Sequence, residues 1–171
     1  MELALGGCRI RSWRREDVSA LSRHADNRKI WLNVRDHFPH PYTLADADLW
    51  IDRVLTSGQP ETQFAIEVDG EAAGGVGVFL QEDVSRRSAE IGYWLGEAHW
   101  GRGIMTDVVR RFTAFAFDAY DLLRLYAMVF EWNASSCRVL EKAGYTCEAR
   151  LRRAVLKDGH VLDQFVYAVV R

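Results

Sequence analysis

One stretch of the chain joins an extended segment, a glycine-containing turn and an amphipathic helix, and it constrains the fold more than any other stretch. It covers residues 89–106 and reads AEIGYWLGEAHWGRGIMT. Gly101 and Gly103 permit a tight turn in which backbone N–H groups approach a ligand without a Cβ in the way. The helix that follows directs its unsatisfied amides and the positive end of its dipole to the same place. The stretch therefore predicts a site for a phosphorylated ligand.

The helix after the turn is predicted from apolar residues that recur on one face. These residues are Met105, Val108, Val109, Phe112, Phe115, Ala116 and Ala119. Two other glycine-loop motifs do not fit this turn. A Walker loop ends in Gly-Lys-Ser/Thr, and a dinucleotide fingerprint has a third glycine where this chain has Thr106. A nucleotide-hydrolysing protein is therefore disfavoured.

The turn resembles the pyrophosphate loop of the GNAT superfamily of acyl-CoA-dependent N-acetyltransferases, which reads Gln/Arg-x-x-Gly-x-Gly/Ala. Here Trp100 replaces the usual Gln or Arg, and Met105 replaces the usual small residue. Trp-Gly-Arg-Gly followed by Ile-Met-Thr is similar to the RimJ/RimL branch, the ribosomal-protein N-terminal acetyltransferases and their relatives. Acetyl-CoA is the co-substrate that this resemblance implies. The implied coenzyme-binding residues are Trp94, Leu95, Trp100, Gly101, Arg102, Gly103, Ile104, Met105, Thr106, Asn133 and Ser136.

Other segments resemble the same branch, so the resemblance covers almost the whole chain. Residues 133–136 read Asn-Ala-Ser-Ser and precede a Val-Leu-Glu-Lys-Ala-Gly-Tyr run at 139–145. Residues 38–43 read Phe-Pro-His-Pro-Tyr-Thr and resemble the acceptor-side segment of the branch. Asp158-Gly159, Asp163 and Tyr167 match its closing hairpin.

Composition indicates one globular domain spanning residues 1–171. Its 22 basic and 24 acidic residues leave a formal charge of −2, which does not favour nucleic-acid binding. Three cysteines form no metal spacing and suit a reducing compartment. No apolar run is long enough to span a membrane, and the start lacks a signal-peptide pattern. We therefore expect a cytoplasmic protein with no membrane partner.

The pattern of apolar residues and turns predicts a mixed α+β fold. The resemblance implies the GNAT fold, a mostly antiparallel twisted sheet of about seven strands with a splayed strand pair, flanked by about four helices. Strands are expected at 8–13, 63–68, 72–80, 88–95, 123–130, 147–156 and 161–170. Helices are expected at 16–25, after the cap Thr43, after the glycine turn and at 135–143.

The family's splayed pair corresponds here to residues 88–95 and 123–130. Splaying leaves backbone groups unpaired, and the amide-rich pantetheine arm can pair with them. Trp94 and Leu95 are the candidates for these main-chain contacts. A backbone N–H at this place would also polarise the thioester carbonyl as negative charge develops.

Glu90 is the candidate general base. Alternation along a strand places it on the face of Gly92 and Trp94, and several members of the family carry a catalytic glutamate on this strand. Three alternatives stay open: a structural glutamate, a water chain, and Glu148 as the base. A protein α-amino group, with a pKa of about 7.7–8.0, costs far less to deprotonate than a lysine, for which the cost is about 4 kcal/mol. A weak base therefore suffices for an N-terminal acceptor.

Ser136 holds the serine position of the Asn-x-x-Ser motif, which the resemblance implies returns a proton to the departing thiolate. Asn133 accompanies it on the pantetheine side. The alternative is that Asn133 caps a helix and Ser136 stands in its first turn. Both roles are compatible.

Trp31, Asn33 and Tyr42 are the candidate residues of the acceptor pocket, with packing around the prolines as the alternative. The five histidines show no metal spacing, so no metal ligand is assigned. Arg150, Arg152, Arg153 and Lys157 form a basic set on a solvent face, or meet an acidic substrate tail or the coenzyme's ribose phosphate.

The leading hypothesis is an acetyl-CoA-dependent N-acetyltransferase that transfers an acetyl group directly to a primary amine. A protein N-terminal α-amine of the RimJ/RimL type is the first acceptor, and a small-molecule amine is the other. A non-catalytic acyl-CoA-binding regulator or sensor is the alternative from another class. Many relatives form dimers, which implies a homodimer here.

Overall fold

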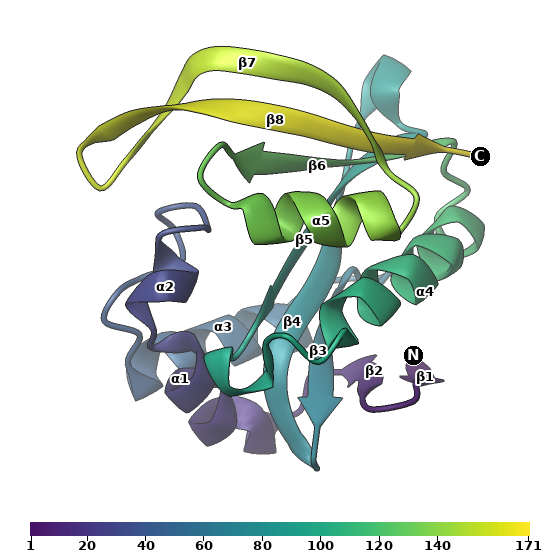
Figure 1. Cartoon of the computed structure of the whole chain (residues 1–171). Coiled ribbons are helices and arrows are strands. Elements are labelled where there is room, and N and C mark those ends of the chain that lie inside the picture. Colours follow the sequence, from purple (N-terminus) through teal and green to yellow (C-terminus); the bar gives the residue numbers. More distant parts are fainter. The chain divides into compact units, whose positions relative to one another are not determined.

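The computed structural model describes residues 1–171, and they fall into two compact units. The first unit comprises Met1–Gly77 and Tyr93–Ile104, and the second comprises Val78–Gly92 and Met105–Arg171. The chain has eight strands in one mostly antiparallel sheet, ordered β1-β2-β3-β4-β5-β6-β8-β7, together with five α-helices (Figure 1). This is the mixed α+β architecture that the sequence predicts.

The first unit is built on an antiparallel set of strands. They are β1 (Glu2–Ala4), β2 (Arg9–Ser12), β3 (Gln63–Val68) and the first part of β4 (Glu71–Leu80). Asp69 and Gly70 form the predicted two-residue turn between β3 and β4, with φ of 53° and 86°. Two successive positive φ values match the right-handed twist of the strands, which explains the Asp-Gly pair.

Three helices complete the first unit: α1 (Val18–Ala25), α2 (Arg28–Trp31) and α3 (Leu44–Thr56). Thr43 caps α3, since its hydroxyl accepts the Asp46 N–H while the Asp46 carboxylate accepts the Thr43 N–H. The apolar faces of α1 and α3 join one core. Its fully buried members are Trp13, Leu21, Ala25, Ala47, Ile51, Ala65 and Ala72.

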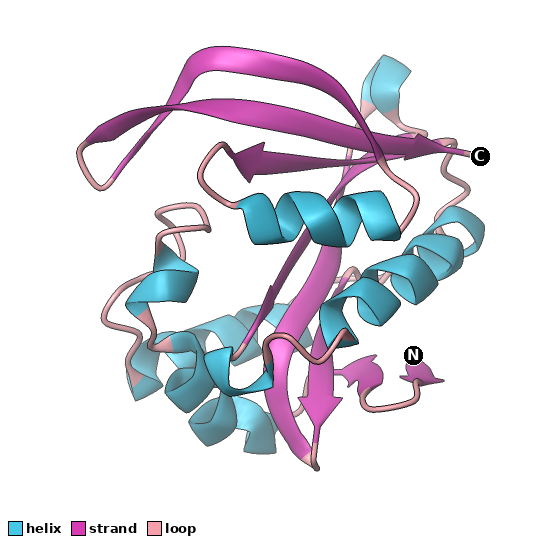
Figure 2. Ribbon diagram, in the orientation of Figure 1, coloured by secondary structure: helices cyan, strands magenta, loops and turns pink.

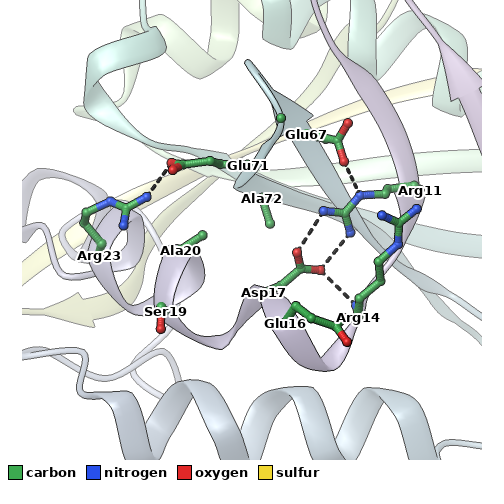
Figure 3. A pocket seen from close by; sticks show the side chains of 11 residues that line it. Arg11, Arg14, Glu16, Asp17, Ser19, Ala20, Arg23, Glu67, Glu71 and Ala72 are labelled. Atoms are coloured by element: carbon green, nitrogen blue, oxygen red, sulfur yellow. Dashed lines mark hydrogen bonds and ion pairs between the residues drawn. The ribbon is translucent and has the colours of Figure 1, made fainter.

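A buried ion network stabilises the same unit. The Arg11 guanidinium donates to both carboxylate oxygens of Asp17, at 2.7 and 2.8 Å, and its Nε donates to Glu67 at 2.5 Å (Figure 3). Arg11 is 3% exposed and Asp17 is 6% exposed. The pairing, chiefly with Asp17, raises the pKa of Arg11 despite its burial. Such charges tolerate burial only because each is hydrogen-bonded.

The second unit contains one parallel strand pairing among antiparallel ones. Its strands are the last part of β4, residues 78–80, and the first part of β5 (Ser88–Leu95), with β6 (Arg124–Phe130), β7 (Thr146–Lys157) and β8 (His160–Val170). β5 pairs with β6 in parallel at only three positions, from Ser88↔Arg124 to Glu90↔Tyr126. β8 pairs along the whole length of β6, from Arg124↔Val170 to Phe130↔Gln164.

Two helices belong mainly to this unit: α4 (Ile104–Ala119), which begins at the last residue of the first unit, and α5 (Ala134–Lys142) (Figure 2). Arg110 of α4 donates to the Lys142 carbonyl at 3.0 Å. Thr113 of α4 and Tyr145 share a buried hydroxyl–hydroxyl hydrogen bond of 2.7 Å. The Tyr167 hydroxyl of β8 donates to Glu141 of α5 at 2.9 Å, so α5 is tied to both α4 and β8.

Every strand and helix expected from the sequence is confirmed, with ends that differ by a few residues. Two further elements raise the totals to eight strands and five helices. β1 has three residues and α2 has four, so neither is long enough to show a hydrophobic period. None of the helices combines the length and the apolar run that crossing a bilayer requires.

Substitution of Gly74 by alanine is expected to destabilise the first unit. A Cβ at Gly74 of β4 would lie 2.5 Å from the Trp94 carbonyl oxygen and 3.1 Å from the Leu95 Cα, both backbone atoms. The backbone must shift, so we expect a loss of about 1–3 kcal/mol of unfolding free energy. Chemical denaturation measures this loss. Gly6→Ala is the control, because no atom lies within 4 Å of its added Cβ; equal stabilities of the two variants would contradict the prediction.

Candidate active site

The glycine turn that the sequence predicts is present, and its two glycines adopt conformations that favour glycine. Gly101 and Gly103 have φ of 76° and 78°, in the left-handed region that other residues adopt at a cost. Both lie exposed, with no atom within 4 Å of an added Cβ. The α4 helix begins directly after them at Ile104. The turn therefore presents open backbone at a helix N-terminus, the arrangement that binds anions.

Trp100 has a local role that explains why it stands where the family usually has Gln or Arg. Its indole N–H donates to the Leu95 carbonyl at 2.7 Å, which links the start of the turn to the end of β5. The side chain is 44% exposed. The hydrogen bond from Trp100 thus fixes the backbone at Leu95, one of the two residues predicted to contact the ligand through the main chain.

Arg102 lies at the rim of the turn between two side chains that sequence reasoning missed. Its Nη1 lies 3.1 Å from His99 Nδ1 and 3.7 Å from Asp69 Oδ2. Since a guanidinium only donates, His99 Nδ1 accepts in this contact. The three-residue spacing of His99 and Arg102 could have predicted their contact from the sequence. Asp69 could not have been predicted, because it lies in the β3–β4 turn, far away in the chain. A cation held at the turn strengthens its fit to an anionic ligand.

Trp94 is fixed in the first unit by close packing against glycines of β4. A Cβ at Gly75 would lie 2.8 Å from the Trp94 Nε1, so only glycine permits this approach. The Trp94 ring also meets Phe38 edge-on, with centroids 5.6 Å apart. These contacts make the end of β5 a rigid support for the turn.

The three candidate acceptor residues lie in the first unit in different environments. Trp31 stacks on His40 with centroids 5.7 Å apart, and the Arg28 guanidinium lies 5.5 Å from its ring. Asn33 donates its Nδ2 to the Lys29 carbonyl at 2.9 Å, but its Oδ1 is buried without a hydrogen-bond partner. Tyr42 is only 6% exposed, and burial raises the pKa of its hydroxyl to about 12. Tyr42 is thus part of the core cluster, whereas Asn33 has an acceptor atom to offer.

A separate cavity of about 450 Å³ in the first unit contains none of the predicted site residues (Figure 3). It lies beside the Arg11 network, between β2, α1 and the β3–β4 turn. Three arginines and four acidic residues line it: Arg11, Arg14, Arg23, Glu16, Asp17, Glu67 and Glu71. Most of these charges already pair with one another, so the cavity shows no clear preference for an anion or a cation.

Glu90 occupies the last position of the parallel β5–β6 ladder, opposite Tyr126. Its neighbours Ala89 and Ile91 are buried at 0% and 2% exposure, whereas Glu90 is half-buried. The predicted alternation of faces is therefore observed from Ser88 to Gly92, whereas Tyr93 and Trp94 are both half-buried. The carboxylate stands where the parallel pairing stops.

Asn133 caps α5, as one of the two interpretations predicts. Its side-chain oxygen accepts the Ser136 N–H at 3.1 Å, and its own N–H donates to the Phe130 carbonyl at 2.8 Å. The cap uses the Ser136 backbone N–H and not its hydroxyl, so capping and the role that the family resemblance implies are compatible. Met105 and Thr106, also in the second unit, lie half-buried in the first turn of α4.

Glu148 is engaged in an ion pair that makes it a poor base. Both of its oxygens accept from the Arg124 guanidinium, one of them at 2.8 Å. This pairing lowers the pKa of Glu148 below its usual range. A carboxylate held in its charged form accepts a proton less readily, so Glu90 is the better candidate.

The chain matches the model of the acetyltransferase (GNAT) domain over residues 8–146, and it therefore belongs to the GNAT acetyltransferase family. A probable N-acetyltransferase, YjcK of Bacillus subtilis, is 39% identical over 102 residues, which are 60% of this chain and 56% of that protein. The spermidine N(1)-acetyltransferase of Escherichia coli K12 is 26% identical over 153 residues, covering 88% of this chain and 79% of that protein.

Among solved structures, RimJ of Mycobacterium smegmatis in complex with a CoA disulfide superposes with a TM-score of 0.84. The two chains are 26% identical, and the match covers 95% of this chain and 81% of RimJ. The family and this likeness confirm the resemblance to the RimJ/RimL-type branch. The chain spans about half the length of the two curated relatives that it matches at the highest identity.

Replacement of Trp100 by phenylalanine is expected to weaken the binding of acetyl-CoA. The variant keeps an aromatic ring but loses the hydrogen bond to the Leu95 carbonyl, which frees the start of the turn. A net hydrogen bond is worth about 1 kcal/mol, so we expect the Kd to rise about fivefold. Calorimetric titration with acetyl-CoA measures the change. Trp50→Phe in α3 is the matched control, and an unchanged Kd in Trp100→Phe would contradict the assigned role.

Proposed function

We propose that this protein is an acetyl-CoA-dependent N-acetyltransferase that transfers an acetyl group directly to a primary amine. The observation that carries the proposal is the turn at Gly101 and Gly103, whose left-handed glycines open onto the N-terminus of α4 in a chain of the GNAT family. The preferred acceptor is a protein N-terminal α-amine of the RimJ/RimL type.

The coenzyme half of the proposed site uses backbone more than side chains. The exposed amides of the turn and the dipole of α4 bind the pyrophosphate, and Arg102 adds a positive charge. Ile104, Met105 and Thr106 supply the first amides of the helix. The main chain at Trp94 and Leu95 contacts the pantetheine arm, and an N–H there stabilises the oxyanion that forms on the thioester carbonyl.

The proposed chemistry is one nucleophilic acyl transfer. Glu90 takes a proton from the acceptor ammonium, and the neutral amine attacks the thioester carbonyl to give a tetrahedral intermediate. Collapse of the intermediate forms the amide and expels the CoA thiolate. The Ser136 hydroxyl gives its proton to the thiolate and takes up the proton that the attacking nitrogen loses, so the hydroxyl is restored. An α-amine suits this site because its pKa of about 7.7–8.0 makes the free-energy cost of its deprotonation near neutral pH small.

The acceptor half of the site draws on Trp31, Asn33 and Tyr42. The buried Oδ1 of Asn33 lacks a partner in the structure, and an amine or peptide N–H of the acceptor would satisfy it. Tyr42 contributes by holding the segment in place, since it is buried in the core. The spermidine acetyltransferase among the relatives supports a small-molecule amine as the other acceptor class.

We infer that residues 1–171 act as a single domain, that the protein works in the cytoplasm and that it forms a homodimer. Light scattering during size-exclusion chromatography tests the dimer directly.

An acceptor screen tests the proposed function as a whole. We expect CoA release, followed with a thiol reagent, when the protein is mixed with acetyl-CoA and peptides that carry a free N-terminus. Polyamines and aminoglycosides form the comparison sets. Binding of acetyl-CoA without transfer to any amine would instead indicate the non-catalytic acyl-CoA sensor.

Glu90→Gln is expected to lower kcat by about tenfold at neutral pH, because only about a tenth of an α-amine with a pKa of about 7.7–8.0 is neutral there without a base. The Kd for acetyl-CoA should stay within about twofold of the original value. The loss should shrink near pH ~9, because an α-amine is then neutral without help. Glu148→Gln is the matched control and should keep its turnover. A loss in Glu90→Gln that is equal at every pH would indicate a structural glutamate.

Ser136→Ala is expected to lower kcat by about 10- to 100-fold, because the departing thiolate loses its proton donor. The cap of α5 is retained, since Asn133 accepts from the Ser136 backbone N–H and not from its hydroxyl. Steady-state kinetics measures the effect, and thermal unfolding checks that the variant is folded. Full activity of the variant would remove Ser136 from the mechanism.

A further inference from the structure

The β7 strand carries a bulge that is built around one carboxylate of β8. Leu151 pairs with Gln164 and Val155 pairs with Leu162, so Arg152, Arg153 and Ala154 together stand opposite Asp163 alone. β7 is the last strand of the sheet order. A bulge at this place redirects side chains that a regular strand would alternate between its two faces.

The bulge contains a conformation that needs support. Arg153 has a φ of 52°, in the left-handed region that costs a residue with a Cβ about 1–2 kcal/mol. Its N–H donates to Asp163 Oδ1 at 2.7 Å, and Arg150 Nε donates to Asp163 Oδ2 at 2.5 Å. These contacts, led by the Arg153 N–H, lower the pKa of Asp163. Backbone strain that is held by neighbours in this way is typical of functional segments.

The arginines of the bulge differ in how far their charge is compensated. Arg150 is paired with Asp163 and also lies 3.3 Å from Glu131. No hydrogen bond or ion pair joins the guanidinium group of Arg152 or Arg153 to another residue, although the Arg152 charge helps to lower the pKa of Asp163, and both residues are exposed. Arg150 therefore stabilises the bulge, whereas the charged groups of Arg152 and Arg153 face solvent.

Glu131 connects this bulge to the segment just before α5, the helix that contains the candidate proton donor Ser136. The Glu131 carboxylate accepts the Asp163 N–H at 2.9 Å, and the Glu131 N–H donates to the Asp163 carbonyl at 3.1 Å. Two residues later Asn133 caps α5 and receives the Ser136 N–H. All of these groups belong to the second unit, so Arg152 and Arg153 lie in the same compact unit as Ser136.

We propose that Arg152 and Arg153 bind an acidic segment that follows the N-terminal amine of a protein acceptor. This inference rests on the proposed acetyltransferase function and names its substrate class. Guanidinium groups bind carboxylates through paired hydrogen bonds, and exposed like charges raise the rate of encounter with an oppositely charged peptide. The same two charges repel a polyamine, which is itself a polycation. Acidic peptides are therefore the preferred acceptors, and polyamines are poor ones.

Three peptides of equal length test the proposal. They share their first two residues, and the following positions are acidic (Glu and Asp) in the first peptide, neutral (Gln and Asn) in the second and basic (Lys) in the third. We expect kcat/KM to be at least about tenfold higher for the acidic peptide than for the neutral one, mainly through KM. Added salt should reduce this preference, because it screens exposed charges. Arg152→Glu/Arg153→Glu should remove the preference and favour the lysine peptide. Arg86→Glu/Arg111→Glu, which changes the net charge equally at two other exposed arginines, should keep it.

A binding measurement separates failure of this inference from failure of the proposed function. Anisotropy of a labelled acidic peptide should report binding that Arg152→Glu/Arg153→Glu abolishes, whether or not acetyl transfer occurs. If no amine is acetylated but the acidic peptide still binds, the proposed function alone is overturned. Equal kcat/KM and equal binding for the three peptides would overturn the inference alone. Weaker binding of CoA but not of dephospho-CoA in the double variant would assign the arginines to the coenzyme phosphate and overturn it too.

Discussion

The early end of the parallel pairing between β5 and β6 is the constraint on which the proposed chemistry depends. Only three residue pairs join these strands, and the ladder stops at Glu90 and Tyr126. The remaining residues of β6 pair with β8 on their other side. Backbone groups beyond the stop are strong donors and acceptors that require partners. The amide-rich pantetheine arm of the proposed co-substrate is suited to that requirement, and Glu90 stands where the parallel pairing stops.

The coenzyme turn shows how a departure from a family pattern is compensated locally. Trp100 lacks the charge and the flexible chain of Gln or Arg, but its indole N–H reaches the Leu95 carbonyl. The turn is thereby tied to the strand that precedes it. Arg102, within the turn, places a cation at the proposed phosphate site, with His99 and Asp69 beside it. The glycines keep their left-handed conformations around these changes.

Long, periodic elements and local caps could be predicted from the sequence, because their causes lie close together in the chain. The α4 face, the Asp69–Gly70 turn and the Thr43 and Asn133 caps are of this kind. β1 and α2 escaped prediction, since three or four residues show no period. The partners of Trp100, Glu148 and Arg153 also escaped, because each depends on atoms that only folding brings near. Arg150, Arg152, Arg153 and Lys157 looked alike as a basic set on a solvent face. The solvent-face prediction is wrong for Lys157, which is 2% exposed, and the structure separates the paired Arg150 from Arg152 and Arg153.

The buried network of Arg11, Asp17 and Glu67 limits how this chain can change over evolutionary time. Loss of one acidic partner would leave a charge in the protein interior with too few hydrogen bonds, which is far more damaging than loss of the whole group. Neutral drift by single substitutions is therefore blocked at these positions. Among homologous chains, the three residues should be inherited together or replaced together by an apolar set, even though none of them takes part in the proposed reaction.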